Sequence, residues 1–176
     1  MEKPAKVVLV PYQPEWPARF EAIRQQLAAI FPAPHCTIEH IGSTSVPGMV
    51  AKPVIDIMLG APALSDIEGM QEHLAKTGFH YVAEFTTAMP ERRYFVRPQM
   101  HPRTVHLHAV VYGGEFWRDH LLFRDALRRD DVLSQAYATL KRELAANYAS
   151  SSWAYTDAKT GFVRAALNHA RMTAKQ

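Results

Sequence analysis

Apolar and polar residues follow two different spacings along the chain, and these spacings predict helices and strands. Residues 14–31 carry an apolar residue every three or four positions, which is typical of a helix with one buried face. Residues 65–78 begin with the capping-box pattern Ser-Asp-Ile-Glu and end at Gly78, so a second helix is expected there. The apolar positions of the first helix are Trp16, Phe20, Ile23, Leu27 and Ile30.

Strand patterns occupy the space before and after the second helix. Residues 36–41 predict a short strand, and residues 54–59 are almost continuously apolar, which is typical of a strand buried on both faces. Residues 79–85 alternate between apolar and polar, and residues 93–96 are expected to pair with them. Residues 104–112 show the clearest alternation, with His106 and His108 on the same face.

From Gly113 onward the apolar spacing becomes helical again. Two apolar stripes cover residues 116–148, and a last helix is expected to contain residues 155–166. This order predicts an α+β fold, in which a mixed β-sheet packed with helices is followed by a helical C-terminal tail. The pattern shows no internal repeat and no long linker, so residues 1–176 are expected to form a single domain.

Composition limits the class of protein. The 176 residues include one cysteine, Cys36, which suits a reducing compartment, and a short apolar run at residues 7–10 that is not long enough for a signal peptide or membrane span. We therefore expect a cytoplasmic protein with no membrane partner. Residues 1–88 carry 6 Lys and Arg against 9 Asp and Glu, and residues 89–176 carry 14 against 8. The basic half suits an anionic ligand, but without a dense basic run we predict no specific nucleic-acid binding.

One carboxylate, Asp56, interrupts the apolar run of residues 54–59. Burying an ionised carboxylate costs on the order of several kcal/mol unless it is paired or binds a metal. The segment Gly42-Ser43-Thr44 precedes it, with 12 residues between Ser43 and Asp56. A glycine turn with Ser and Thr hydroxyls can hold phosphate, and Mg²⁺ prefers carboxylate and phosphate oxygens, so the pair suggests a metal–nucleotide site. A plain turn beside a structural aspartate remains the alternative.

Several separated motifs resemble the GrpB family, a branch of the polymerase-β-like nucleotidyltransferase superfamily. They are "IGSTSVPGMVAKPVIDI", "HLHAVVYGGEFWRDHLLFRDALR", "AYATLKREL" and "YTDAKTGFV", and the resemblance extends from about Val10 to Val163. The superfamily pattern is a hydrophobic-Gly-Gly/Ser segment followed by Asp-hydrophobic-Asp/Glu. The resemblance implies a nucleotidyltransferase-like fold with Gly42, Ser43 and Asp56 in the site.

The chain departs from that pattern at Met58, where the resemblance leads us to expect a second carboxylate. Two-metal phosphoryl transfer usually needs at least two bridging carboxylates. His106 and His108 stand on a later strand, and imidazoles beside one carboxylate suit Zn²⁺, Mn²⁺, Fe²⁺ or Ni²⁺ better than Mg²⁺. A metal site of Asp56, His106 and His108 is one hypothesis; packing of these histidines on a half-buried face, or direct phosphate binding by them, is the other.

Four basic residues are candidates for phosphate binding. Lys52 precedes the Asp56 strand. Arg92 and Arg93 enter a later strand from which one of them could face the glycine turn, and we take Arg93 as the candidate. Lys141 and Lys159 lie in helical motifs shared with the family, from which they could reach over the site. For Lys52 a surface or structural ion pair is the alternative, and for Lys141 and Lys159 a solvated helix position or a tether between helices is the alternative.

These features predict a protein that binds a nucleotide and a divalent metal, Mg²⁺ or Mn²⁺ if it is a nucleotidyltransferase, and that transfers a nucleotidyl group to an unidentified acceptor with Asp56 as the catalytic carboxylate. Two alternatives stay open. The first is a non-catalytic nucleotide-binding or interaction module that has lost the second carboxylate. The second is a histidine-based phosphohydrolase, suggested by "HLHAVV", although Val110 occupies the place of its third histidine.

Overall fold

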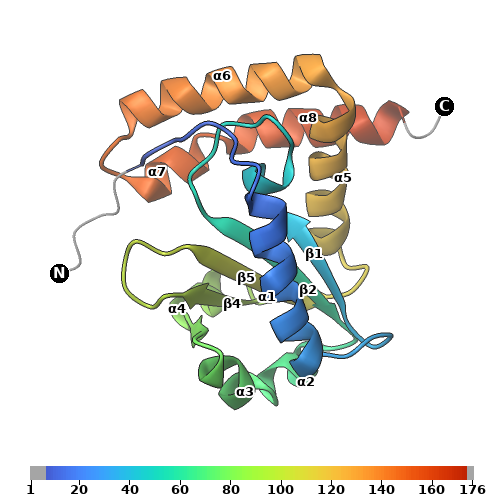
Figure 1. Cartoon of the computed structure of the whole chain (residues 1–176). Helices are drawn as coiled ribbons and strands as arrows, with labels where there is room; N and C mark the ends of the chain where they lie inside the picture. The colour runs from blue at the N-terminus through green and yellow to red at the C-terminus, as the bar shows by residue number, and fades with distance from the viewer. Residues whose placement is uncertain (1–6, 174–176) are drawn as a thin grey trace.

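A five-stranded mixed β-sheet forms the middle layer of the structure, a computed structural model that describes residues 7–173 (Figure 1). The sheet order is β1-β2-β5-β4-β3, in which β2 and β5 are parallel and the other neighbours are antiparallel. The strands are β1 (Thr37–Ile41), β2 (Ile55–Ala61), β3 (His80–Tyr81), β4 (Arg92–Arg97) and β5 (Val105–Val111). Asp56 and the two histidines therefore lie on two adjacent inner strands, β2 and the central strand β5.

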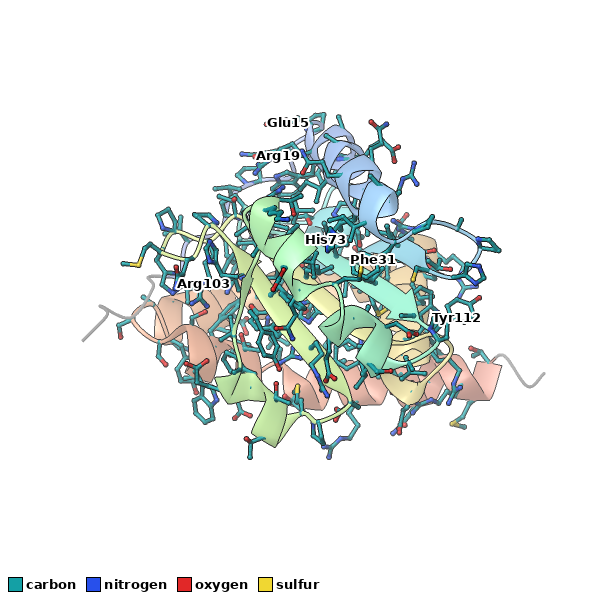
Figure 2. The ribbon with its side chains drawn as sticks, turned by 90° about the horizontal axis from the view of Figure 1, so that it is seen from below. Glu15, Arg19, Phe31, His73, Arg103 and Tyr112 are labelled. Atoms are coloured by element: carbon teal, nitrogen blue, oxygen red, sulfur yellow. The ribbon has the colours of Figure 1, made fainter. Side chains whose placement is uncertain are left out.

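Helices cover both faces of this sheet, with α1 on one side and the C-terminal helices on the other (Figures 1 and 2). The helices are α1 (Trp16–Ile30), α2 (Leu64–Glu68), α3 (Gln71–Lys76), α4 (Glu84–Ala88), α5 (Glu115–Arg129), α6 (Asp131–Asn147), α7 (Ser152–Asp157) and α8 (Thr160–Thr173), with one 3₁₀ turn, η1 (Ser43–Ser45). The predicted α+β fold, a mixed sheet followed by a helical tail, is confirmed. No helix within residues 7–173 has both the length and the apolar character needed to cross a membrane.

The larger hydrophobic core lies between α1 and the sheet face that we call the α1 face. Ile55, Ile57 and Leu59 alternate onto this face of β2 and are fully buried. Trp16 and Leu27 of α1 belong to the same buried cluster. The apolar spacing of residues 14–31 therefore predicted this helix and its buried side correctly, since burial of such side chains drives the packing.

The opposite side of the sheet, which we call the α5 face, carries Asp56 and Met58. Trp117 of α5 packs directly on β2 at Gly60. A Cβ atom at Gly60 would lie 2.6 Å from the Trp117 ring, so the ring occupies the space that a side chain would need. Met58 is completely buried in the same cluster as Trp117, together with Ile41 and Val110. The apolar cover of this face ends beside Asp56, which keeps 27% of its side-chain surface exposed.

Three predicted elements differ from the structure. The strand expected over residues 79–85 stops at Tyr81, because the chain leaves the sheet edge after Val82 donates to the Tyr94 carbonyl, and α4 follows. The helix expected over residues 65–78 is divided into α2 and α3. Its cap is Ala63, whose N–H donates to Asp66, rather than Ser65.

The third difference concerns the last helix. Residues 155–166 were expected to form one continuous helix, but α7 ends at Asp157 and α8 begins at Thr160. Lys159 therefore lies at the break between two helices, with its side chain above the ring of Tyr155.

Candidate functional site

Asp56, His106 and His108 form a compact group on the α5 face. The parallel register of β2 and β5 places Asp56 opposite His106, and the alternation of β5 brings His108 to the same face. Oδ1 of Asp56 lies 3.1 Å from Nδ1 of His106 and 3.8 Å from Nε2 of His108. One ligand atom from each residue falls within 4.8 Å of the others, and it is the sole group of this kind in residues 7–173.

The electrostatic state of this group suits metal binding. Burial on its own raises the pKa of Asp56, but the hydrogen bond from His106 and the neighbouring His108 ring outweigh it and hold the pKa below its usual range. Burial lowers the pKa of His108 to about 4, despite the neighbouring carboxylate. The group therefore presents an ionised carboxylate and a neutral imidazole near neutral pH, and these are the protonation states in which such side chains bind metals.

The donor set of this group fits a transition metal. Imidazole nitrogens with one carboxylate suit Zn²⁺, Mn²⁺, Fe²⁺ or Ni²⁺, whereas Mg²⁺ prefers oxygen ligands throughout. A second carboxylate is absent from the expected position, because Met58 fills it and lies in an apolar cluster with Trp117. The site can hold one metal through Asp56 and imidazole, but it does not show the paired carboxylates of a two-metal centre.

The backbone of the predicted phosphate turn lies directly against Asp56. Gly42 has φ +69° and ψ −175°, and a Cβ atom there would lie 2.4 Å from Oδ2 of Asp56. Ser43 and Thr44 follow in η1. The hydroxyl of Thr44 is 2.9 Å from Nε2 of His40, so this buried side chain is already engaged, while Ser43 faces Lys141. The sequence thus correctly placed Gly42 beside the carboxylate.

Three lysines gather around the same turn. Nζ of Lys141 donates to Oγ of Ser43 at 2.8 Å and to the Val50 carbonyl, and the residue is only 1% exposed. Nζ of Lys52 donates to Oγ of Ser152 at 3.1 Å. Lys52 and Lys159 both lie over the ring of Tyr155, at 5.5 and 4.4 Å from its centre.

These lysines are held in an environment that disfavours positive charge. Burial, with Lys159 and Arg142 nearby, lowers the pKa of Lys141 to about 7, and burial with the adjacent Lys52 lowers that of Lys159 to about 8. Burial also lowers the pKa of Lys52. Within residues 7–173 no carboxylate lies within 4.0 Å of any of the three amino groups. Such a cluster favours a polyanion, which would restore the charged form of each lysine.

Arg93 is not part of this group, so its predicted place at the phosphate turn is wrong. It pairs with Ala109 in the register of β4 and β5, on the α1 face, and its guanidinium binds Glu68 at 2.7 Å. The neighbouring Arg92 has the opposite parity and points to the α5 face, where its Nη1 lies 3.1 Å from Nδ1 of His108. Sequence reasoning took Arg93 rather than Arg92 because the sheet face on which each residue lies depends on the strand register. The register is set by pairing across the sheet and cannot be read from the strand alone.

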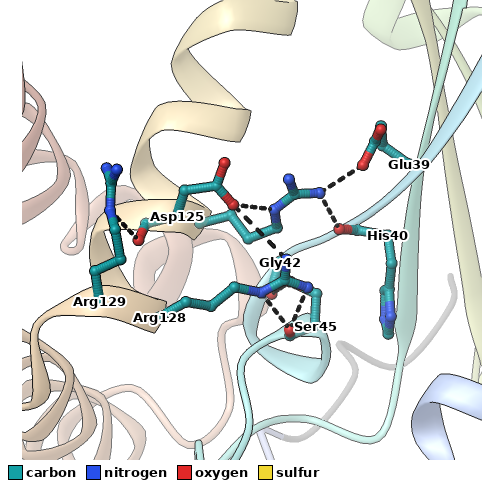
Figure 3. A network of polar contacts seen from close by, with 8 residues as sticks. Glu39, His40, Gly42, Ser45, Asp125, Arg128 and Arg129 are labelled. Atoms are coloured by element: carbon teal, nitrogen blue, oxygen red, sulfur yellow. Dashed lines mark hydrogen bonds and ion pairs between the residues drawn. The ribbon is translucent and has the colours of Figure 1, made fainter.

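Two arginines of α5 bind β1 and the turn that follows it, and Figure 3 shows Arg128 against Ser45 of the turn. Arg124 donates to Glu39 at 2.7 Å and to the His40 carbonyl at 3.1 Å, and it also pairs with Asp125. Arg128 donates twice to the Ser45 carbonyl, at 3.0 and 2.7 Å. Sequence reasoning did not identify Arg128, since contacts 83 residues apart leave no local pattern.

A cavity of about 520 Å³ lies beside Lys159, between α5 and α8. Its wall includes Tyr137, whose ring lies 4.9 Å from Nζ of Lys141, so the cavity adjoins the lysine cluster. The sequence treated Tyr137 only as one position of an apolar stripe. The lining residues are Glu115, Asp119, His120, Tyr137, Thr156, Lys159, Thr160, Val163, Arg164, Leu167 and Arg171.

Comparison with known proteins identifies the family of this chain. The family described as "GrpB protein" matches residues 6–169. Glutamate-rich protein GrpB of Alkalihalophilus pseudofirmus is 32% identical over 165 residues, which cover 93% of this chain and 95% of that protein. The crystal structure of conserved protein GrpB from Enterococcus faecalis is 31% identical, with a TM-score of 0.85 over 96% of this chain and 100% of that one.

A more distant likeness concerns the fold alone. The Cid1 poly(U) polymerase matches 77% of this chain and 42% of its own, at 12% identity and a TM-score of 0.51. This chain therefore shares the nucleotidyltransferase-like fold that the sequence resemblance implied.

Proposed function

The chain belongs to the GrpB family, and on this premise we propose that it binds a nucleoside triphosphate with a divalent metal and transfers the nucleotidyl group to an acceptor. One observation carries the proposal: buried Lys141 donates to the glycine turn that touches Asp56, and half-buried Lys52 and Lys159 lie close by over Tyr155, all three without carboxylate partners in the described chain. A cation cluster beside a metal-binding carboxylate is the arrangement that a triphosphate requires.

In this proposal the lysines and Ser43 bind the phosphates, and the group of Asp56, His106 and His108 binds the metal. Lys141 and Lys159 neutralise phosphate oxygens, and Ser43 is positioned for a phosphate by its hydrogen bond from Lys141. The group of Asp56, His106 and His108 supplies the metal ligands. A bound metal would polarise the phosphoryl oxygens and stabilise developing negative charge. Asp56, kept ionised by its hydrogen bond with His106 and by the nearby His108, is the carboxylate available to hold it.

The cavity between α5 and α8 is the place for the nucleoside part of the ligand. It begins at Lys159 and Tyr137, so a triphosphate on the lysines leaves its sugar and base facing this space. A volume of about 520 Å³ lies within the range of small-molecule sites, which is about 300–1,000 Å³.

One observation favours a second candidate function, a nucleotide-binding module without catalysis. Met58 is fully buried against Trp117, so the missing second carboxylate has been replaced by a packed apolar core. The histidine-based phosphohydrolase has no such support. Val110, at the place of its third histidine, is 1% exposed and belongs to the same apolar cluster.

Calorimetric titration tests binding. ATP, GTP, CTP and UTP would each be added with Mg²⁺, Mn²⁺, Zn²⁺ or no metal to the wild type, Asp56→Asn and Lys141→Met. We expect metal-dependent binding that Asp56→Asn abolishes and Lys141→Met weakens at least about tenfold, a loss typical of a charged hydrogen-bond partner. Circular dichroism checks that each variant is folded. Binding of no nucleotide under any metal would contradict the proposal.

Release of pyrophosphate separates the two candidates. The nucleotide that binds would be incubated with the protein, and pyrophosphate would be measured with and without cell-extracted small molecules as acceptors. Release that depends on Asp56 supports transfer, whereas binding without release supports the non-catalytic module.

A further inference from the structure

His120 of α5 has a tautomer that its own helix determines. Nδ1 of His120 lies 2.8 Å from the carbonyl oxygen of Phe116. A carbonyl oxygen can only accept a hydrogen bond, so Nδ1 carries a proton and donates it. Burial lowers the pKa of His120, so the imidazole is neutral near pH 7 and its other nitrogen, Nε2, keeps an unshared lone pair.

The orientation of the His120 ring is also fixed. The ring stacks on that of Phe116, with 3.8 Å between the ring centres and 13° between the planes. Because Nδ1 faces the backbone of α5, Nε2 lies on the ring edge directed away from that backbone. Nε2 has no hydrogen-bond partner among residues 7–173. His120 therefore presents a hydrogen-bond acceptor with a defined direction.

This acceptor belongs to the wall of the cavity between α5 and α8. The other polar side chains that α5 contributes to the cavity are those of Glu115 and Asp119, and ionised carboxylates accept hydrogen bonds without donating them. Asp119 is engaged by Arg171, and Glu115 is exposed at the start of the helix. The α5 wall thus offers acceptors, and among them His120 is half-buried and has no partner at Nε2.

The cationic side chains of the cavity come from the other wall. They are Lys159, just before α8, with Arg164 and Arg171 of α8. The hydroxyl groups of Thr156, Thr160 and Tyr137 can donate or accept, so they do not distinguish one ligand from another. A ligand with its phosphates at Lys159 therefore meets a preference for N–H donors only along α5.

Nucleobases differ in the group that they would place against this acceptor. Adenine and cytosine carry an exocyclic amino group, which donates a hydrogen bond. Hypoxanthine, guanine and uracil carry a carbonyl group at the corresponding ring position, and a carbonyl only accepts. A carbonyl facing Nε2 of His120 would leave both groups without a partner, which a half-buried site penalises.

We propose that His120 is the specificity residue of the cavity and selects adenine or cytosine by accepting a hydrogen bond at Nε2 from the amino group of the base. The inference rests on the proposed function, because it takes the cavity as the place of the nucleoside. It narrows the substrate class to adenine or cytosine nucleoside triphosphates.

Calorimetric titration with matched nucleotide pairs tests the selection. The pairs are ATP with inosine triphosphate and CTP with UTP, each with the divalent metal that supports binding. In any pair that binds, the wild type should bind the amino member at least about tenfold more tightly. His120→Phe keeps a ring for stacking but has no acceptor, and it should bind both members within about twofold. His169→Phe, at an exposed position of α8, is the matched control and should keep the preference.

Inorganic triphosphate separates this inference from the proposed function. It should bind the wild type and His120→Phe equally, because His120 is assigned to the base and not to the phosphates. Nucleotides that bind the wild type without a preference in either pair, or with a preference for the carbonyl member, would overturn the selection and leave the proposed function in place. Binding of no nucleotide would overturn both.

Two further results would overturn the role of His120. One is a folded His120→Phe protein that keeps the wild-type preference. The other is a protonated Nε2 of His120 in nitrogen NMR of the ¹⁵N-labelled wild type near pH 7, with the signals identified by their loss in His120→Phe. The wild-type titration decides the preference on its own, so the test remains if the variant fails to fold.

Discussion

A Cβ atom at Gly42 would lie 2.4 Å from Oδ2 of Asp56, so the turn and the carboxylate occupy space that admits no side chain between them. Gly42 also has φ +69° with ψ −175°, a conformation that is essentially restricted to glycine. We expect Gly42→Ala to destabilise the fold by about 2 kcal/mol or more, from strain plus displacement of Asp56. Urea unfolding would measure the change, and zinc and nucleotide binding should weaken with it.

Two other glycines serve as controls for this substitution. Gly48 has φ +75° but nothing within 4 Å of its virtual Cβ, so Gly48→Ala should show the strain alone, about 1 kcal/mol. Gly161 lies in α8 in open space, and Gly161→Ala should be neutral or stabilising by up to about 1 kcal/mol. Equal effects of Gly42→Ala and Gly48→Ala would show that the approach to Asp56 is not close.

Two histidines, buried His40 and half-buried His108, should make the protein sensitive to acid. Burial lowers the pKa of His40 and of His108 from 6.5 to about 4. Because the folded state binds protons less readily than the unfolded state, the stabilisation is complete above pH 6.5 and is lost as the pH falls toward 4. The loss is at most about 3 kcal/mol per histidine. Urea unfolding at pH 7, 5.5 and 4.5 would measure it.

The matched variants for the acid prediction are His108→Gln and His73→Gln. His73 is exposed on α3, so its replacement should leave the pH dependence of the unfolding free energy unchanged. His108→Gln should flatten the curve between pH 6.5 and 4. A wild-type unfolding free energy that is constant over this range would contradict the prediction.

Binding of a polyanion should draw protons onto the lysine cluster. Burial lowers the pKa of Lys141 to about 7 and that of Lys159 to about 8, so both are largely neutral at pH 8.5 in the free protein. A triphosphate stabilises the charged forms and raises these pKa values, so proton uptake on binding should be larger at pH 8.5 than at pH 6.5. Calorimetry in two buffers of different ionisation enthalpy measures the number of protons.

Lys141→Met should reduce this uptake, because it removes one of the titrating amino groups. Lys76→Met, an exposed lysine on α3, should leave it unchanged. Nucleotide binding with no dependence on the buffer at pH 8.5 would show that the lysines do not contact the phosphates.

Filling the cavity should block the nucleoside without removing the phosphate site. Val163 lines the cavity from α8, and Val163→Trp would occupy much of its volume. We expect nucleoside triphosphate binding to weaken at least about tenfold, while binding of inorganic triphosphate is retained. Ala165→Trp, exposed on the same helix, is the control and should change neither. Loss of inorganic triphosphate binding in Val163→Trp would place the phosphates themselves in the cavity.

Local patterns in the sequence determined the order of elements and part of the site. The helical spacing of residues 14–31 and the alternation of residues 104–112 identified α1 and β5, because amphipathic spacing follows directly from the repeat of each element. Asp56 was identified as a candidate because it is the one carboxylate inside an apolar strand pattern. The division of residues 65–78 into two helices was missed because a cap depends on which backbone groups the rest of the chain leaves unpaired.

Tertiary structure decided which side chains meet. Arg92, rather than Arg93, reaches His108 because the register of β4 against β5 sets which face each residue occupies, and a shift of one position reverses every face. Lys141 meets Ser43 across 98 residues only when α6 folds over the turn. Sequence alone determines chemistry within one strand or helix, whereas the distances between Asp56, its histidines and the lysines arise from packing between elements that are remote along the chain.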